Sequence, residues 1–189
     1  ATDADGDSVT FTASGSDVVI NNVSGVIAFN AAPDYETKSS FTSTVTATDG
    51  LNSSTQDITI AINNLNDNSP VLTSGTDFTV DENTSAVGTI TGSDADGDTL
   101  SYSISGTDAD SLFIDSASGV LAFNEATDYE TKTSYSFNLI ISDGVNSVTN
   151  PAIISITNLN DNSPIFTSAE TFSIPENESS IGTVEATDA

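Results

Sequence analysis

Apolar and polar residues alternate along several short stretches of this 189-residue chain. In one stretch Tyr135, Phe137, Leu139 and Ile141 occupy every second position, and most of the residues between them are serine or asparagine. The stretches 41–47, 58–62 and 152–156 follow the same period of two. This period, carried by β-branched and aromatic residues, is typical of strands with one buried face. No segment carries the apolar stripe of an amphipathic helix, so the pattern predicts an all-β protein.

The sequence repeats itself with a period of 94 residues. The seven residues Asn64–Pro70 recur unchanged as Asn158–Pro164, and the five residues Asp34–Lys38 recur unchanged as Asp128–Lys132. Internal repetition at a fixed period indicates tandem structural units. Near the N-terminus the shift is 91 instead, since Asp3 corresponds to Asp94, so one loop of the second unit must be three residues longer.

The phase of the repeat predicts three parts. Residues 67–160 form a complete unit, residues 1–66 form a partial unit without its first two strands, and residues 161–189 hold a linker and the first strands of a third unit. Turn residues separate the strand candidates of the complete unit. These candidates are centred on Phe78, Ile90, Tyr102, Phe113, Leu121, Leu139 and Ile154. Seven short strands favour tandem Greek-key β-sandwiches of immunoglobulin-like size.

Composition excludes several classes of function. Twenty-eight acidic residues stand against two basic ones, Lys38 and Lys132, which gives a net charge of −26 that disfavours nucleic acid and anionic lipid as partners. The chain has no cysteine or histidine, so disulfides, zinc sites and histidine-based catalysis are excluded. Its apolar runs are too short to span a membrane, and its first residues do not resemble a signal peptide, so we expect a mature fragment or a piece of a longer chain.

The acidic residues gather with asparagines in loops and at strand ends, while the exposed strand faces carry serine and threonine. Clustered carboxylates repel one another unless a cation joins them. Calcium takes about six to eight oxygen ligands, which suits this composition, whereas the lack of histidine and cysteine disfavours zinc, copper and nickel. An EF-hand is excluded, because its glycine and glutamate positions counted from Asp3 hold Ser8 and Ser14. Solvated acidic loops are the alternative interpretation.

Several motifs, in fixed order, resemble those of tandem cadherin repeats, and the serine-, threonine- and asparagine-rich composition resembles the bacterial surface type. They are an Asp-x-Glu pair at Asp34–Glu36 and Asp128–Glu130, a linker at Asn64–Pro70 and Asn158–Pro164, Pro-Glu-Asn at Pro175–Asn177 with the variant Asp81–Asn83, and Asp-x-Asp at Asp3–Asp5 and Asp94–Asp96. Asparagine replaces the first aspartate of each linker, which we expect to weaken one calcium ion at each junction.

The resemblance implies up to three calcium ions at each junction between repeats. At the first junction the implied ligands are Asp34, Glu36, Asn64, Asn66, Asp67, Asn68, Asp94, Asp96 and Asp143. At the second they are Glu82, Asp128, Glu130, Asn158, Asn160, Asp161, Asn162 and Asp188. Asp3, Asp5 and Asp49 would face a preceding unit, and Glu176 a following linker. Asp7 and Asp98 are interpreted as turn residues, and the two lysines as structural residues paired with an acid.

The implied function is that of an extracellular, calcium-dependent structural or adhesive array on a bacterial surface. The expected partners are neighbouring repeats or copies of the chain, with other cell-surface proteins or glycans as open possibilities. No enzyme activity is expected: an Asp-x-Glu pair could serve a glycosidase, but no tryptophan accompanies it to hold a sugar. The alternative hypothesis is a filament subunit, in which the C-terminal strands of one copy complete the partial N-terminal unit of the next.

Overall fold

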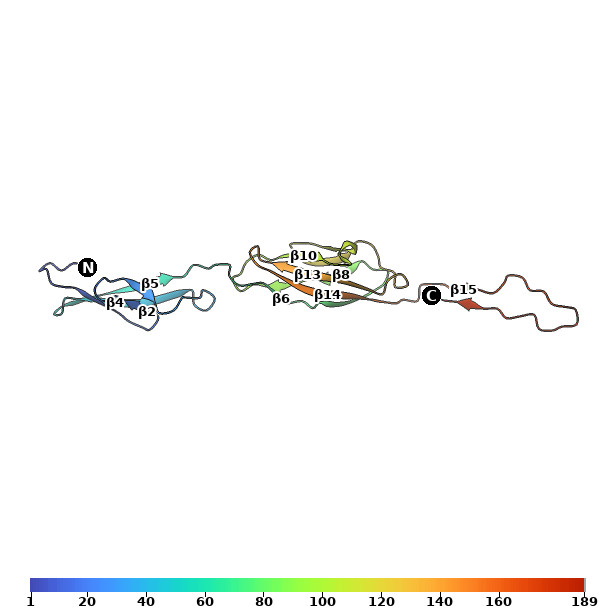
Figure 1. Ribbon diagram of the computed structural model, residues 1–189, viewed down its shortest axis with the longest axis horizontal. Coiled ribbons are helices and arrows are strands. Elements are labelled where there is room, and N and C mark those ends of the chain that lie inside the picture. Colours follow the sequence, from blue (N-terminus) through green and yellow to red (C-terminus); the bar gives the residue numbers. More distant parts are fainter. Residues whose placement is uncertain (189) are drawn as a thin grey trace. The chain divides into compact units, whose positions relative to one another are not determined.

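The computed structural model describes residues 1–188, which form two compact units. Unit 1 comprises residues 1–68 and 94–98, and unit 2 comprises residues 69–93 and the chain from Thr99 onward. As the alternation predicted, the elements are strands, apart from the three-residue 3₁₀ helix η1 (Ala109–Ser111) (Figure 1). Within residues 1–188 no helix combines the length and the apolarity that a membrane crossing requires. The repeat boundaries expected at 66/67 and 160/161 stay a prediction.

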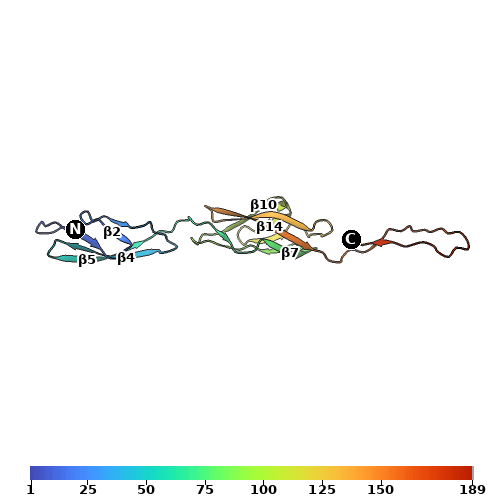
Figure 2. The same cartoon turned by 60° about the horizontal axis from the view of Figure 1, so that its bottom comes forward.

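Unit 2 is a β-sandwich. Its larger sheet has the order β10-β13-β14-β7, with β7 parallel to β14 and the other pairs antiparallel (Figure 2). These strands are β7 (Asp77–Asp81), β10 (Ser101–Ser105), β13 (Ser134–Ser142) and β14 (Ser147–Thr157). The second sheet has the order β11-β12-β8, and a further short pair joins β6 to β9. These strands are β6 (Val71–Leu72), β8 (Ala86–Thr89), β9 (Gly92–Ser93), β11 (Leu112–Ile114) and β12 (Val120–Phe123).

The core of unit 2 lies between its two sheets. Both sheets contribute, with Leu121 from β12 and Ile154 from β14 almost without exposed surface. The other buried members are Ile90, Leu112, Phe123, Phe137, Leu139, Ala152 and Ile156. The alternating face predicted from Phe137 and Leu139 is confirmed, because both are buried while their neighbours in β13 are not. Burial of this apolar surface is the main stabilising contribution.

Six of the seven strand candidates in this unit lie within strands, and one needs correction. The strand expected around Ile90 is interrupted, since β8 ends at Thr89 and β9 begins at Gly92. The backbone N–H of Ile90 instead donates to the carbonyl oxygen of Gly119 (2.8 Å). The two-residue strands β6 and β9 were not predicted. The three-residue length difference between the repeats coincides with η1, since Asp17 corresponds to Asp108 and Val18 to Leu112.

Unit 1 repeats part of this architecture. Its sheet has the order β1-β4-β5, and β2 pairs with β3. The strands are β1 (Thr10–Ala13), β2 (Val18–Ile20), β3 (Ile27–Phe29), β4 (Ser40–Thr48) and β5 (Ser53–Ala61). They correspond to β10, β11, β12, β13 and β14, and the described residues of unit 1 hold no strand at the positions of β7 and β8. Among the described hydrophobic residues of unit 1, only Val18 is buried.

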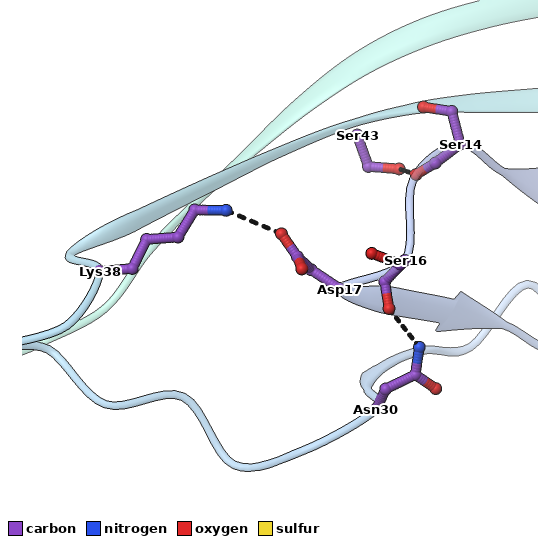
Figure 3. Close-up of polar contacts among 6 residues, drawn as sticks. All are labelled: Ser14, Ser16, Asp17, Asn30, Lys38 and Ser43. Carbon is purple, nitrogen blue, oxygen red and sulfur yellow. Dashed lines mark hydrogen bonds and ion pairs between the residues drawn. The ribbon is translucent and has the colours of Figure 1, made fainter.

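One position that is apolar in the core of unit 2 holds a hydrogen-bonded serine in unit 1. Ser43 corresponds to the core residue Phe137, and its hydroxyl donates to the carbonyl oxygen of Ser14 (2.8 Å; Figure 3). Nearby, the side-chain amide of Asn30 donates to the carbonyl oxygen of Ser16. A serine in place of phenylalanine removes a large apolar side chain, so the interior of unit 1 is correspondingly smaller.

Each lysine makes the same two contacts in its own unit, one with an aspartate and one with an aromatic ring. Lys38 pairs with Asp17 (2.7 Å) and lies over the ring of Phe41, while Lys132 pairs with Asp108 and lies over the ring of Tyr135 (Figure 3 for Lys38). The predicted local pairing with an acid is therefore confirmed. Asp108 also accepts the backbone N–H of Ser136, and the hydrogen bond from Lys132 is the main reason that the pKa of Asp108 is lowered.

Beyond β14, the described chain forms a single short strand pair, β15 (Ile165–Phe166) with β16 (Ala186–Thr187). The pairing of Ile165 with Thr187 corresponds to that of Val71 with Ser93 in β6–β9, at the shift of 94 residues. The other strands expected in residues 161–189 do not form in the described range, because no strand equivalent to β14 is present there to pair with them.

Candidate metal centres

A buried glutamate organises the first acidic centre, which lies in unit 2. Glu82 follows β7 and is only 2% exposed. Its Oε2 accepts the N–H of Tyr129 and its Oε1 accepts the N–H of Leu159, each at 2.7 Å. Three carboxylate oxygens lie within 4.8 Å of one another, one each from Glu82, Asp128 and Glu130. Carboxylates this close repel one another, and a bound cation relieves that repulsion.

The motif Asp128–Lys132 holds its first acid in a tight turn. Asp128 accepts the hydroxyl (2.8 Å) and the backbone N–H (3.1 Å) of Thr131. The hydroxyl of Thr131 is the largest reason that the pKa of Asp128 is lowered. Asp34 makes the equivalent contacts with Thr37, and its pKa is lowered in the same way. Both aspartates are therefore ionised and pre-positioned at neutral pH.

The second acidic centre lies in unit 1, around Asp96. The backbone and the side-chain amide of Asn68 donate to its two carboxylate oxygens at 2.8 and 2.9 Å, and the backbone N–H of Asp67 donates at 3.1 Å. Asn64 donates its amide to the carbonyl oxygen of Asp96 (2.7 Å). Carboxylate oxygens of Glu36, Asp67 and Asp96 lie within 4.8 Å of one another. Linker residues predicted as ligands are thus folded around Asp96.

In this centre the pKa values of two neighbouring acids are shifted in opposite directions. Hydrogen bonds, led by the side chain of Asn68, lower the pKa of Asp96. Glu36 receives a hydrogen bond from its own backbone N–H, which lowers its pKa. Desolvation and the neighbouring Asp34 and Asp96 outweigh that effect, so the pKa of Glu36 is raised. Raised and lowered values side by side are what close carboxylates produce when no cation separates them.

A third group joins Asp94, Asp96 and Asp98, whose carboxylate oxygens also lie within 4.8 Å of one another. Asp94 Oδ1 accepts the N–H of Asp96 (2.9 Å) and of Asp98 (3.3 Å). Asp94 Oδ2 is buried and has no hydrogen-bond partner among the described residues. Asp98 was interpreted as a turn residue, but its carboxylate belongs to this group. The one sequence feature that could have identified it is its proximity to Asp94 and Asp96.

Several predicted ligands lie outside these three groups. Asp143 is buried, and its Oδ1 accepts the N–H groups of Val145 (2.7 Å) and Asn146 (2.6 Å); Asp49 makes the same turn with Leu51 and Asn52. Asp161 accepts the side-chain amides of Asn83 and Asn162. The other predicted carboxylate ligands outside these groups are Asp3, Asp5, Asp34, Glu176 and Asp188. The groups contain carboxylates alone, so they do not test the predicted asparagine ligands Asn64, Asn66, Asn68, Asn158, Asn160 and Asn162. Ligation by any predicted residue stays a prediction.

The donor set fits calcium. Carboxylate and amide oxygens are the ligands that calcium prefers, and the chain offers no histidine or cysteine to a softer metal. Two observations indicate that a positive charge belongs at these positions. Glu82 is a buried carboxylate beside two further carboxylates, and Asp94 Oδ2 is a buried oxygen without a donor. Both features are costly in a folded protein unless a cation compensates them.

Comparison with known sequences gives distant relatives of one kind. No family model matches the chain. Protocadherin Fat 4 from mouse is 33% identical over 185 residues, which is 89% of this chain and 4% of that protein. The protocadherin-like wing polarity protein stan from Drosophila melanogaster is 33% identical over 181 residues, 87% of this chain and 5% of that protein. The chain therefore spans only a small part of these relatives. The bacterial type expected from composition stays a prediction.

Solved structures agree on the fold. A protocadherin gammaB7 EC3-6 cis-dimer structure matches with a TM-score of 0.81 and 21% identity, over 99% of this chain and 53% of that one. Human CDH23 EC21-23 matches with a TM-score of 0.80 and 19% identity, over 96% of this chain and 68% of that one. These relatives support the extracellular location predicted from the sequence. The chain has the all-β, cadherin-like repeat fold of cadherin extracellular domains.

Proposed function

We propose that the chain is part of an extracellular adhesive or structural array in which calcium ions stiffen the junctions between cadherin-like repeats. The observation that carries this proposal is Glu82, a nearly buried carboxylate fixed by two backbone N–H groups beside Asp128 and Glu130. A calcium ion held by these three carboxylates would offset their mutual repulsion. We further propose that the array belongs to a bacterial surface protein, that it has no enzymatic activity, and that neighbouring repeats or other copies are its partners.

In this role the residues of the chain bind and position the ion, and the ion supplies only charge neutralisation. Glu82, Asp128 and Glu130 would hold calcium in unit 2, while Glu36, Asp67, Asp96 and Asp94 would do so in unit 1. Without an ion, repulsion among these acids favours open linker conformations. With it, the linker residues Asn64–Asn68 are fixed against the acids that they already contact around Asp96.

The test is chelation of the whole chain. Extracellular modules bind calcium with Kd values of about 10⁻⁴–10⁻³ M. At tenfold excess over Kd each site adds about 1.4 kcal/mol to the stability of the folded state. Addition of EDTA should therefore lower the Tm and increase the hydrodynamic radius, and calcium should restore both. Magnesium at equal concentration is the control for ionic strength. A Tm and a radius that do not respond to calcium would contradict the proposal.

Terbium luminescence offers a direct reading of the ion at Glu82. The chain has four tyrosines and no tryptophan, so tyrosine must sensitise any bound Tb³⁺. Tyr129 adjoins Asp128 and Glu130 and donates its N–H to Glu82, which places a sensitiser at the centre. We expect Tyr129→Leu to remove most of the signal from this centre, and Tyr102→Leu, in β10, to retain it. Equal loss in both variants would contradict binding at Glu82.

A further inference from the structure

A left-handed turn follows β7 in unit 2. Asn83 has φ +64°, a conformation that is uncommon outside glycine but that asparagine adopts more readily than most residues. The hydroxyl of Thr84 donates to the carbonyl oxygen of Asp81 (2.7 Å) and stabilises the turn. Asn177, one repeat of 94 residues later, has φ +70°. The same conformation at two equivalent positions indicates that the local sequence determines this turn.

The turn joins three segments that carry predicted calcium ligands. Glu82 directly precedes Asn83 and belongs to the first segment. The backbone N–H of Asn83 donates to the carbonyl oxygen of Thr127 (2.8 Å), the residue before Asp128 in the second segment. Its side-chain amide donates to Oδ2 of Asp161 (2.5 Å) in the linker, which is the third segment. One residue is therefore hydrogen-bonded to both of the other segments, through its backbone and through its side chain.

The amide of Asn83 is well suited to hold the linker carboxylate. Asp161 lies outside the carboxylate group around Glu82, and its Oδ1 accepts the amide of its sequence neighbour Asn162 (3.0 Å). Among the described residues, Asn83 is the partner that joins the Asp161 side chain to a segment outside the linker. A lysine or arginine at this position would neutralise the carboxylate. An amide orients it and leaves both its charge and its remaining lone pairs for a cation.

We propose that Asn83 is a positioning residue for the calcium centre at Glu82, which holds Asp161 and the loop before Asp128 in place before an ion binds. This inference rests on the proposed function, because it concerns the ligands of the same centre. Repulsion among the carboxylates favours their separation, and the two hydrogen bonds of Asn83 oppose it. Ligands that are already held in place lose less conformational entropy when the ion binds, so the centre binds calcium more tightly.

Glycine separates this role from that of a residue that only shapes the turn. Because glycine adopts a positive φ without steric cost, Asn83→Gly retains the turn and removes the amide that binds Asp161. Asn177→Gly is the matched control. Asn177 has the same left-handed backbone, but its side chain forms no hydrogen bond within residues 1–188.

The first test measures amide hydrogen exchange of the whole chain in EDTA. The N–H groups of Leu159 and Asp161 are both hydrogen-bonded in the linker. Asn83→Gly should accelerate their exchange about tenfold, the factor expected for the loss of one hydrogen bond to a charged group. The N–H of Ile156, which is hydrogen-bonded within β14, should keep its rate, and Asn177→Gly should exchange like wild type. Unchanged exchange at Leu159 and Asp161 in Asn83→Gly would overturn the proposal.

The second test measures ion affinity at the same centre. In a Tyr35→Leu background, terbium luminescence sensitised by Tyr129 reports the centre at Glu82. Adding Asn83→Gly should weaken terbium binding, and its displacement by calcium should shift equally, by about tenfold, as is typical when a residue that orients metal ligands is lost. Asn177→Gly in the same background should bind as before. Faster exchange with unchanged affinity would make Asn83 a structural residue only and would overturn the proposal.

The two tests also separate this inference from the proposed function. If the Tyr35→Leu chain binds neither terbium nor calcium, the calcium function fails, and with it the positioning role. If that chain binds both ions and Asn83→Gly binds them equally well, the calcium function stands and the role of Asn83 alone is overturned. The exchange comparison needs no bound ion, so it decides in either case whether Asn83 holds Asp161.

Discussion

Unit 1 and unit 2 are built on the same repeat, but among the described residues nearly all of the buried apolar side chains belong to unit 2. The two units share the order of their common strands and the lysine–aspartate pair. They also share an edge-to-face aromatic pair, Phe29 with Phe41 in unit 1 and Phe123 with Tyr135 in unit 2, with ring centroids 4.9 and 4.7 Å apart. They differ in the segment 69–93, which gives unit 2 β7, Glu82, β8 and Ile90. In unit 2 this segment, about a quarter of the repeat, contributes both to the core and to an acidic centre.

The strands that remain in unit 1 carry smaller side chains at the facing positions. Ser43, Val45 and Ala47 stand where unit 2 has Phe137, Leu139 and Ile141. Buried apolar area scales with side-chain size, so unit 1 gains less from its sheet even before the missing strands are counted. The difference predicts that matched substitutions at equivalent positions will have unequal effects. Three matched pairs of variants, and one variant of unit 2 with an exposed control, can break or sharpen the comparison.

The largest difference should come from the core. Ile154 is 0% exposed, and Ile154→Ala should cost about 2–5 kcal/mol of unfolding free energy. The equivalent Ile60→Ala removes a side chain that is only partly buried, so we expect less than about half of that loss. Urea unfolding of the whole chain, followed by amide exchange to assign each unit, measures both. Equal losses would contradict the open core of unit 1.

Two glycines with left-handed backbones should differ next. At Gly119 (φ +71°) an added Cβ would collide with the carbonyl oxygen of Ile90, whereas at Gly25 (φ +73°) it would meet the ring of Phe11 at 3.3 Å. Both alanine variants carry the left-handed strain of about 1–2 kcal/mol. In Gly119→Ala the backbone at Ile90 must also move to make room for the Cβ. We therefore expect a total loss of about 2–4 kcal/mol of unfolding free energy. Thermal unfolding should show the larger drop in Tm for Gly119→Ala, and the reverse order would rule out this packing.

Replacing the buried glutamate Glu82 with a neutral side chain should lower the stability of the chain by less than the core and glycine substitutions do. Glu82→Gln places an amide NH₂ against one of the N–H groups that the carboxylate accepts, which we expect to cost about 1–3 kcal/mol. Calcium should then stabilise the variant less than it stabilises wild type. Glu178→Gln, at an exposed position, is the control and should leave both quantities unchanged. Calcium titration followed by Tm measures the difference, and an unchanged calcium response in Glu82→Gln would contradict the assignment.

The smallest difference concerns the two lysine pairs. The side chain of Asp108 is 12% exposed and that of Asp17 is 49% exposed, so Lys132→Met should cost about 1 kcal/mol and Lys38→Met less than about 0.5 kcal/mol. Because the pKa of Asp108 is lowered below its ordinary value of about 3.9, the pair stabilises the fold above that pH, and the stabilisation is lost as pH falls through the lowered pKa. Lys132→Met should flatten this loss as the pH falls below about 4, which acid unfolding monitored by circular dichroism can detect.

Local patterns made much of the fold predictable. Alternation identified which faces of β13 and β14 are buried, because a strand fixes the direction of each side chain. Short-range patterns also placed Asp94 and Asp96 together, as their contacts span only a few residues. The interruption at Ile90 escaped prediction because it depends on a hydrogen bond to Gly119, 29 residues away. The two-residue strands β6 and β9 are too short to show a period.

The sequence predicted which acids belong to the acidic centres, but not how deeply each one is buried or which groups it contacts. Two different motifs named Glu82 and Glu36 as ligands, yet Glu82 is nearly buried and Glu36 is exposed. That contrast depends on the N–H groups of Tyr129 and Leu159, which come from distant parts of the repeat. Likewise, the buried Oδ2 of Asp94 follows from packing around it and has no counterpart in sequence spacing.

The parallel pairing of β7 with β14 has a mechanical consequence. β7 lies near the start of the repeat and β14 at its end, and five residues of each are paired side by side, Asp77–Asp81 with Ile153–Thr157. When tension pulls the repeat from both ends, it drags these two strands past each other along their length. The hydrogen bonds between them must then break together, whereas an antiparallel hairpin pulled from its open end unzips one bond at a time. Because β7 is the neighbour of β14, the repeat resists tension best when it is pulled along these two strands.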